Sequence, residues 1–370
     1  MNALRSLWFL ISIGIFSLST VFTHRTITNP DANISEWHIS YSLGFVRRGF
    51  RGELLELWQL TSGLDWSWAE SSLRSFPIGI LTFIVLRKIS VDYPKTLLSW
   101  AALLFPLGLL YFLFDPGTSG TTESLFLLLV YATFSCFSGK SDSIRLLGLF
   151  SLSALVSLMH EGYVFFLPLV IGLAFFLGGK KAPITVQLKN SVAVVSPFII
   201  QLFLVLIAPK PQISYFCAVA LERLGSGSCA TLTLFTEMSL REAIGYSLNR
   251  EFNGELLILA AWIIVVIGVA IALFSRSNFD FLTSKIVKTS TPVMLILSSA
   301  PIFILGGDWG RWLTIIYGSF YLSYLFAKRK TESRTLSLVM FATILLPVTS
   351  GTGSGSSGII FWLKWFLSLT

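Results

Sequence analysis

Long apolar runs separated by short polar segments recur along the whole chain. Runs of this length and polarity are typical of helices that cross a bilayer. The predicted spans are 7–23, 75–88, 97–114, 121–138, 145–159, 163–178, 190–209, 255–274, 290–306, 311–327 and 335–350, with a last apolar piece at 359–369. The pattern predicts an all-α, polytopic integral membrane protein with about 11–12 transmembrane helices.

The run from 145 to 178 decides the topology of everything that follows it. It is too long for one span, and His160-Glu161-Gly162 interrupts it near its middle. We therefore predict two short spans joined by a tight turn. A single span would move the basic segment 180–189 to the opposite side of the membrane.

The charges of the loops give the orientation. The segment after the first apolar stretch has no small-residue cleavage site, so we interpret residues 7–23 as a retained span and not as a signal peptide. With the N-terminus in the cytoplasm, every predicted inner loop is basic, as the positive-inside rule requires. Two larger loops then lie outside: residues 24–74, with a helix in the membrane interface, and residues 210–253.

Composition narrows the possible functions. The chain is 54% hydrophobic and 12% charged, so we expect one membrane domain over 1–370 with no large soluble domain. The net charge of +8 would suggest nucleic acid in a soluble protein. Here basic inner loops account for it, and we expect no nucleic-acid partner. There is no Walker A loop and no nucleotide-binding domain, so we expect no cofactor.

The cysteines suggest a disulfide and no metal. Cys217 and Cys229 lie in the second large outer loop and could form a disulfide if that loop faces an oxidising compartment. Cys136 lies in an apolar run, where packing is the simplest role. Two cysteines without a nearby histidine do not make a zinc site, so we expect no metal.

The first outer loop contains the stretch YSLGFVRRGFRGE at 41–53. Its glycines allow close backbone approach, and the helical pattern at 50–60 places a helix N-terminus, which favours anions, beside the arginines. On that helix Phe50, Leu54, Leu57 and Trp58 share a face suited to the membrane interface. The predicted phosphate-binding residues here are Arg47, Arg48 and Arg51. The alternative is nonspecific contact with anionic headgroups.

Acids and histidines on the outer side are candidates for proton transfer. Asp31 and Glu36 follow the first span, close to His38, and either carboxylate suits a general base toward a sugar hydroxyl. The alternative is turn chemistry in a solvated loop. His160 is a candidate proton carrier oriented by Glu161 or by a distant carboxylate, and Glu161 is itself a candidate catalytic acid-base residue. The alternative is a polar pair that holds the turn.

The motif GGDWGRW at 306–312 joins two late spans. Asp308 and Arg311 are three residues apart and could pair with each other. The same residues suit a catalytic or anion-binding rim. We include Asp308 among the candidate catalytic residues and Arg311 among the candidate phosphate-binding residues.

Three motifs carry a resemblance: LGFVRRGFRGELL after the first span, HEG between two short spans, and GGDWGRW. Together they resemble the multi-span membrane proteins of bacterial surface-polysaccharide loci. The arrangement of many spans with an acidic first outer loop is similar to the GT-C glycosyltransferases and the oligosaccharide polymerases. The first class implies a lipid-phosphate sugar donor and a carboxylate base, at Asp31 or Glu36 by position. The second implies arginines around a polyprenyl pyrophosphate, for which Arg47, Arg48, Arg51 and Arg311 fit.

These observations predict a membrane-embedded glycosyltransferase or polysaccharide polymerase on the extracytoplasmic face of a bacterial inner membrane. It would take sugar from a polyprenyl-phosphate-linked donor. The expected partners are a lipid-linked sugar or oligosaccharide and membrane lipids, and no oligomeric state is indicated. One alternative is a transporter or lipid flippase, which predicts charges buried within spans and broken helices. Another is a noncatalytic scaffold of an envelope complex.

Overall fold

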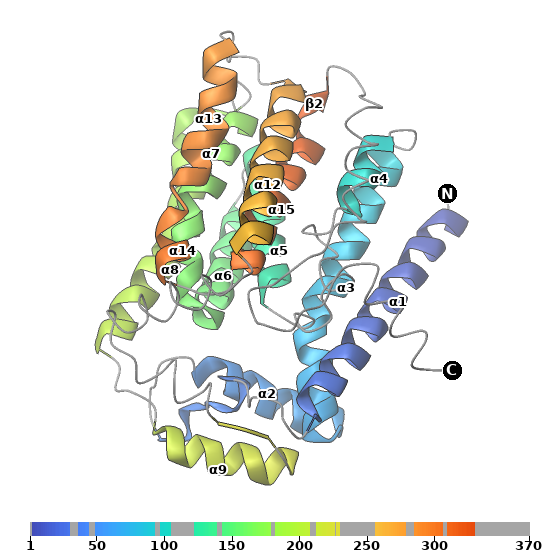
Figure 1. Cartoon of the computed structure of the whole chain (residues 1–370), viewed down its shortest axis with the longest axis vertical. Coiled ribbons are helices and arrows are strands. Elements are labelled where there is room, and N and C mark those ends of the chain that lie inside the picture. The colour runs from blue at the N-terminus through green and yellow to red at the C-terminus, as the bar shows by residue number, and fades with distance from the viewer. Residues whose placement is uncertain are drawn as a thin grey trace.

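The protein is a bundle of α-helices, shown as a computed structural model in Figure 1. The structure describes residues 2–29, 36–43, 49–92, 97–104, 122–138, 143–178, 182–207, 212–225, 227–229, 256–278, 285–305 and 309–329. A helix lies in each predicted span from 7–23 to 311–327, which confirms the all-α membrane fold. The predicted span 335–350 and the apolar piece 359–369 lie outside the described residues.

The first half of the chain supplies most of the long helices. Its elements are α1 (Asn2–Ile27), η1 (Glu36–His38), η2 (Tyr41–Leu43), α2 (Gly49–Ser62), α3 (Trp66–Asp92), α4 (Leu97–Leu103), α5 (Glu123–Ser138), α6 (Ser143–Met159), η5 (Glu161–Phe166), α7 (Leu167–Gly178) and α8 (Ile184–Ile207), where η marks a 3₁₀-helix.

The second half adds α9 (Ile213–Leu224), α12 (Leu256–Arg276), β1 (Ser277–Asn278), α13 (Lys285–Leu297), α14 (Ala300–Leu305), α15 (Trp309–Phe326) and β2 (Lys328–Arg329). The two strands pair antiparallel, with Ser277 opposite Arg329 and Asn278 opposite Lys328. This short ladder ties the end of α12 to the end of α15.

Length and composition identify the helices that can cross a membrane. Within the described part of the chain four helices are long and apolar enough: Ser6–Ile27, Trp66–Val91, Glu161–Gly178 and Ile184–Val205. Shorter apolar helices cover Glu123–Phe137, Ser143–Met159 and Ala261–Ser275. Apolar side chains such as Phe9 and Leu10 of α1 are exposed, as expected for a surface in contact with lipid.

Helix α15 is the central helix of the bundle. Its side chains from Trp312 to Leu325 are buried, and Tyr317, Phe320 and Tyr321 are inaccessible to solvent. A helix that is buried on every side has to lie in the core. It packs against α5, α7 and α12.

Two of the long apolar runs are broken, one between two predicted spans and one within a predicted span. His160 adopts an extended backbone, with φ −160° and ψ 112°, and caps η5. This separates α6 from α7 where the sequence predicted a turn. The predicted span 290–306 divides into α13 and α14 because Pro301, in the first turn of α14, cannot continue a helix from the residues before it.

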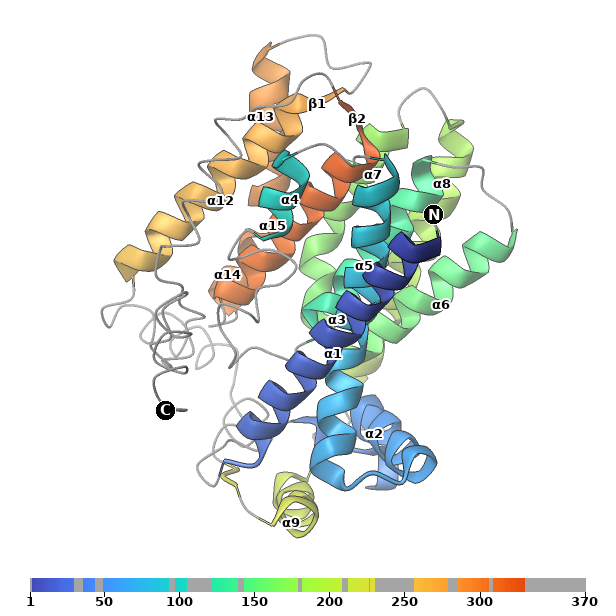
Figure 2. The ribbon, with the colours of Figure 1, turned by 90° about the vertical axis from the view of Figure 1, so that its right-hand side faces the viewer.

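One end of the bundle is covered by short helices. Figures 1 and 2 both show α2 and α9 across the lower end of the bundle, opposite the end that carries β2 and the N-terminus. We call this lower end the α2 end. The predicted helix at 50–60 is present as α2, with Phe50, Leu54 and Trp58 packed against the core and Leu57 exposed.

Candidate functional site

An ion pair between Arg311 and Glu123 joins α15 to α5 at the α2 end. Arg311 Nε and Nη2 both donate to Glu123 Oε1, at 2.8 and 2.5 Å. The Glu123 side chain is 5% exposed, and a carboxylate this deeply buried requires a charged or hydrogen-bonded partner. Among the described residues, no hydrogen-bond partner lies near the second oxygen, Oε2.

Tyr163 lies at the centre of this group. Its ring is fully buried, its hydroxyl shares a hydrogen bond with Thr122 Oγ1, and its ring centroid lies 4.8 Å from that of Phe126. Glu123, Arg311 and Arg51 all act electrostatically on the phenol. Residues from α2, α5, η5 and α15 therefore meet around one tyrosine.

His160 belongs to the same group. Its Nδ1 accepts a hydrogen bond from the Gly162 backbone N–H at 3.0 Å, so the side chain caps η5. The imidazole centroid lies 5.0 Å from the Tyr163 ring and 5.8 Å from the Trp312 ring. A Cβ at Gly162 would lie 2.9 Å from the His160 ring, so the tight cap needs a glycine there. These contacts fit the alternative in which His160 holds the turn.

Arg51 connects α2 to the end of α6. It is buried, its Nε donates to the Met159 carbonyl at 2.6 Å, and its guanidinium lies 5.9 Å from the centre of the Trp37 ring. Gly52 beside it donates to the Ile39 carbonyl at 3.1 Å, and a Cβ at position 52 would collide with that carbonyl. The close approach expected of this glycine is therefore to the protein's own backbone.

A second buried group lies between η1 and α3. His38 Nε2 lies 3.0 Å from Glu70 Oε2, and Arg74 Nη1 donates to Glu70 Oε1 at 2.8 Å. The His38 and Glu70 side chains are 0% and 1% exposed. His38 Nδ1 is buried and has no hydrogen-bond partner among the described residues. A histidine held by a carboxylate through one nitrogen presents the other as a proton acceptor.

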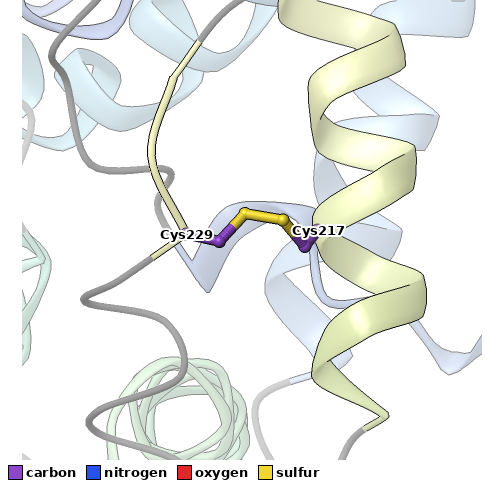
Figure 3. Close-up of a disulfide and its surroundings, with 2 residues drawn as sticks. All are labelled: Cys217 and Cys229. Carbon is purple, nitrogen blue, oxygen red and sulfur yellow. A yellow bond between two sulfur atoms is a disulfide. The ribbon is translucent and has the colours of Figure 1, made fainter.

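Helix α9 covers the segment that follows His38. Its Ile213 and Phe216 pack on Ile39, and Arg223 donates to Glu56 of α2 at 2.8 Å with its guanidinium 4.0 Å from the Trp66 ring. The disulfide between Cys217 and Cys229, shown in Figure 3, ties α9 to the chain that follows it. The suggested disulfide is thus present, and Cys136 is buried and lies outside the disulfide, as its apolar run suggested.

The predicted site residues fall into two groups. Asp31, Arg47, Arg48 and Asp308 lie outside the described residues, so their roles stay predictions. Among the others, Arg51, His160 and Arg311 gather around Tyr163, Glu161 lies in the first turn of η5, and Glu36 begins η1. Within the described ranges no group of three or more His, Cys, Asp or Glu could hold a metal ion.

Sequence reasoning missed two of the buried acids. Glu70 lies in a stretch assigned to the first loop, although its spacing of four from Arg74 is that of a helical ion pair. Glu123 falls at the start of the predicted span 121–138 and was not among the candidate site residues, although an acid directly before a long apolar run is typical of a helix N-terminus. Both signals were present in the sequence.

A bundle of apolar helices in which Arg51, Glu123 and Tyr163 are buried near the α2 end is typical of a polytopic α-helical membrane protein. The chain belongs to the family described as Uncharacterised membrane protein Rv1490, whose sequence model matches residues 7–224. The matched region contains Arg51, Glu70, Glu123 and His160 and ends before Arg311. No curated protein and no solved structure matches the chain.

Proposed function

We propose that this protein is a glycosyltransferase that takes a sugar from a polyprenyl-phosphate-linked donor at the α2 end of the bundle. The observation that carries the proposal is the meeting of Arg51, Glu123, Tyr163 and Arg311 from four separate elements. Ionisable groups buried in a membrane protein are costly and mark functional sites by default. Their position at one end of the bundle suits a lipid substrate with a polar headgroup.

The arginines are suited to the phosphate of such a carrier. A guanidinium binds phosphate oxygens with two parallel hydrogen bonds and stays charged when it is buried. Arg311 already holds a carboxylate through two of its nitrogens. An incoming phosphate competes with Glu123 for Arg311, and the positive charge then stabilises the negative charge that grows on the leaving phosphate.

The orientation is part of the proposal. The α2 end collects the segments that the loop charges assign to the outside, so the N-terminus lies in the cytoplasm and the site faces out of a bacterial inner membrane. The Cys217–Cys229 disulfide supports this orientation, because disulfides form and persist in oxidising compartments.

Deletion and complementation test the proposal. The strain lacking the gene is complemented with wild type, Arg311→Ala, or Arg145→Ala as a matched control, since Arg145 is an exposed arginine at the start of α6. Surface glycans are compared by gel and lipid-linked precursors by mass spectrometry, at equal expression. We expect a lipid-linked precursor to accumulate unless wild type or Arg145→Ala is present. Unchanged glycans and precursors in the deletion strain would overturn the proposal and favour transport.

A further inference from the structure

We infer that His38 is the general base of the proposed transfer and that Glu70 is its positioning residue. The inference rests on the proposed function and goes beyond it, because it assigns the proton acceptor for the acceptor hydroxyl. It also moves that role away from the carboxylates of the first loop to an imidazole that lies beneath α9.

The carboxylate of Glu70 is used at both oxygens. Arg74 donates to Oε1 at 2.8 Å, and His38 Nε2 lies 3.0 Å from Oε2. A charged guanidinium on one oxygen favours the ionised carboxylate, which can only accept hydrogen bonds. Nε2 therefore carries a hydrogen, and the neutral imidazole is left with its lone pair on Nδ1.

The state of His38 Nδ1 is the observation that points to a ligand. The His38 side chain is fully buried, yet Nδ1 has no hydrogen-bond partner in the described part of the chain. Buried polar atoms are nearly always paired, so an exception needs an explanation. His160 offers a contrast within the same protein, because its Nδ1 is satisfied by the Gly162 N–H.

The surroundings of His38 place it beside the proposed carrier site. Trp37, the preceding residue, lies under the guanidinium of Arg51. Ile39, the following residue, packs under Ile213 and Phe216 of α9. Helix α9 is held over this segment by the bond from Arg223 to Glu56 of α2.

The charged groups near His38 come from three helices. Helix α3 supplies Glu70 and Arg74, and α2 supplies Arg51 and Glu53. Helix α9 adds Arg223, which pairs with Glu56 of α2. Glu70 is the carboxylate in contact with the imidazole, so it is the group that stabilises the imidazolium when the proton arrives.

The step is a single displacement at the anomeric carbon. The acceptor oxygen forms a bond to that carbon while the bond from the carbon to the phosphate oxygen breaks, and its electron pair leaves with the polyprenyl phosphate. The hydroxyl proton goes to His38 Nδ1. The resulting imidazolium is held by Glu70, as in the catalytic triads that pair histidine with a carboxylate.

Nitrogen NMR tests the imidazole without any activity assay. The chain has three histidines, so the His38 signals of ¹⁵N-histidine-labelled protein are those lost in His38→Gln. We expect hydrogen on Nε2 and none on Nδ1 in the neutral ring, and a change in both signals in Glu70→Gln. A hydrogen on Nδ1 of the neutral ring, or an imidazolium at every pH, would overturn the inference.

The rate of transfer tests the role in the reaction. The donor is the polyprenyl-linked lipid extracted from the deletion strain, and the readout is polyprenyl phosphate released by wild-type protein in lipid nanodiscs. We expect His38→Gln to lower the rate by about 10²–10⁴-fold without changing the KM for the donor. Glu70→Gln should also lower the rate of transfer without changing the KM for the donor, because the imidazolium loses its partner.

A control variant and the wild-type rate separate the role of His38 from the proposed transferase activity. Glu222→Gln removes an exposed carboxylate of α9 and should leave rate and pH profile as in wild type. Release by wild type with an unchanged rate and pH profile in His38→Gln would overturn the base and leave the transferase standing. No release by wild type would overturn the transferase, and the role of His38 with it.

Discussion

Arg51 donates its Nε hydrogen to the carbonyl oxygen of Met159, with 2.6 Å between the two atoms, although the two residues are 108 positions apart in the sequence. Met159 is the last residue of α6, and the next residue, His160, caps η5. The guanidinium of Arg51, on α2, thus fixes the junction between α6 and the η5–α7 helix. The carbonyls at a helix C-terminus have no partner within the helix, and a cation also complements the helix dipole there.

The first prediction concerns this bond. Arg51→Met keeps an apolar side chain against Trp37 but removes the donor, leaving the Met159 carbonyl unpaired. We expect the free energy of unfolding to fall by about 1.5–3 kcal/mol, the range for hydrogen bonds to charged groups. Thermal unfolding in detergent measures it, with Arg145→Met as the control at an exposed arginine. Equal melting temperatures for the two variants would contradict the assignment.

The second prediction compares two glycines. A Cβ at Gly52 would collide with the Ile39 carbonyl, whereas a Cβ at Gly148 of α6 would have nothing within 4 Å. Gly52→Ala should destabilise by about 1–3 kcal/mol, because α2 has to move away from the segment it packs on. Gly148→Ala should stabilise by roughly 0.5–1 kcal/mol, because it removes glycine from a helix interior. The same effect at both sites would show that the contact at Gly52 is not tight.

The third prediction concerns the ion pair between Arg311 and Glu123: loss of the arginine alone should destabilise the protein more than loss of both charges. Arg311→Ala leaves the Glu123 carboxylate buried without its cation, which typically costs about 3–5 kcal/mol. Glu123→Gln/Arg311→Ala removes the charge as well and should recover much of that loss. A double-mutant cycle on unfolding free energies measures the coupling. Additive effects would mean that the pair contributes no interaction energy.

The fourth prediction is a pH dependence at the start of α3. Asp65 Oδ1 accepts the Trp68 backbone N–H at 3.0 Å and the Ser67 hydroxyl at 2.8 Å. The Trp68 hydrogen bond is the main cause that lowers the pKa of Asp65, against a smaller opposing effect of burial. A lowered folded pKa gives stability that is present above the unfolded pKa and is lost as the pH falls through the folded pKa.

Asp65→Asn provides the comparison, because asparagine also caps helices but does not titrate. The stability difference between wild type and Asp65→Asn should be constant at neutral pH. It should begin to shrink below about pH 4, where Asp65 of the unfolded chain becomes protonated, and the contribution of the charge should be lost as the pH falls through the lower folded pKa. Thermal unfolding at several pH values measures it. A difference that stays the same down to pH 3 would rule out the charge of Asp65 as its cause.

The fifth prediction concerns the anchoring of α9. Reduction of the Cys217–Cys229 disulfide should leave α9 attached through Arg223 and its apolar face alone, so trypsin should cut at Arg223 faster after reduction. Cys217→Ser should be cleaved at Arg223 as fast as reduced wild type. Cys136→Ser should be cleaved as slowly as oxidised wild type, because Cys136 lies in the core and outside the disulfide. Equal cleavage rates before and after reduction would show that the disulfide does not hold α9.

Sequence patterns were sufficient for the helices and insufficient for the contacts between them. Apolar runs predict spans because every backbone group inside a bilayer has to be paired within its own helix. Arg311 illustrates the limit: the structure pairs it with Glu123, 188 positions away, and no local spacing in the sequence indicates that partner. Which helices become neighbours depends on packing over the whole bundle, and no periodicity of one segment contains that information.

Glu70 illustrates a different limit. Trp66–Val91 is long enough to cross a membrane, but its first turns carry serines and charges that resemble a loop. Those polar residues are paired inside the protein, for example Ser75 with Ser19 of α1 and Ser72 with Trp58 of α2. The hydropathy of the chain therefore reveals the apolar part of this helix, whereas its polar first turns are easily assigned to the preceding loop.

The pairing of β1 with β2 restrains how the candidate site can respond to a substrate. Arg311 lies at one end of α15, and β2 follows the other end, where it is clamped to the strand after α12. A helix that is buried along its length and fastened at its far end should move little as a whole. Under the proposed function, we therefore expect a phosphate to replace Glu123 at Arg311 by rotation of side chains, while the axis of α15 stays in place.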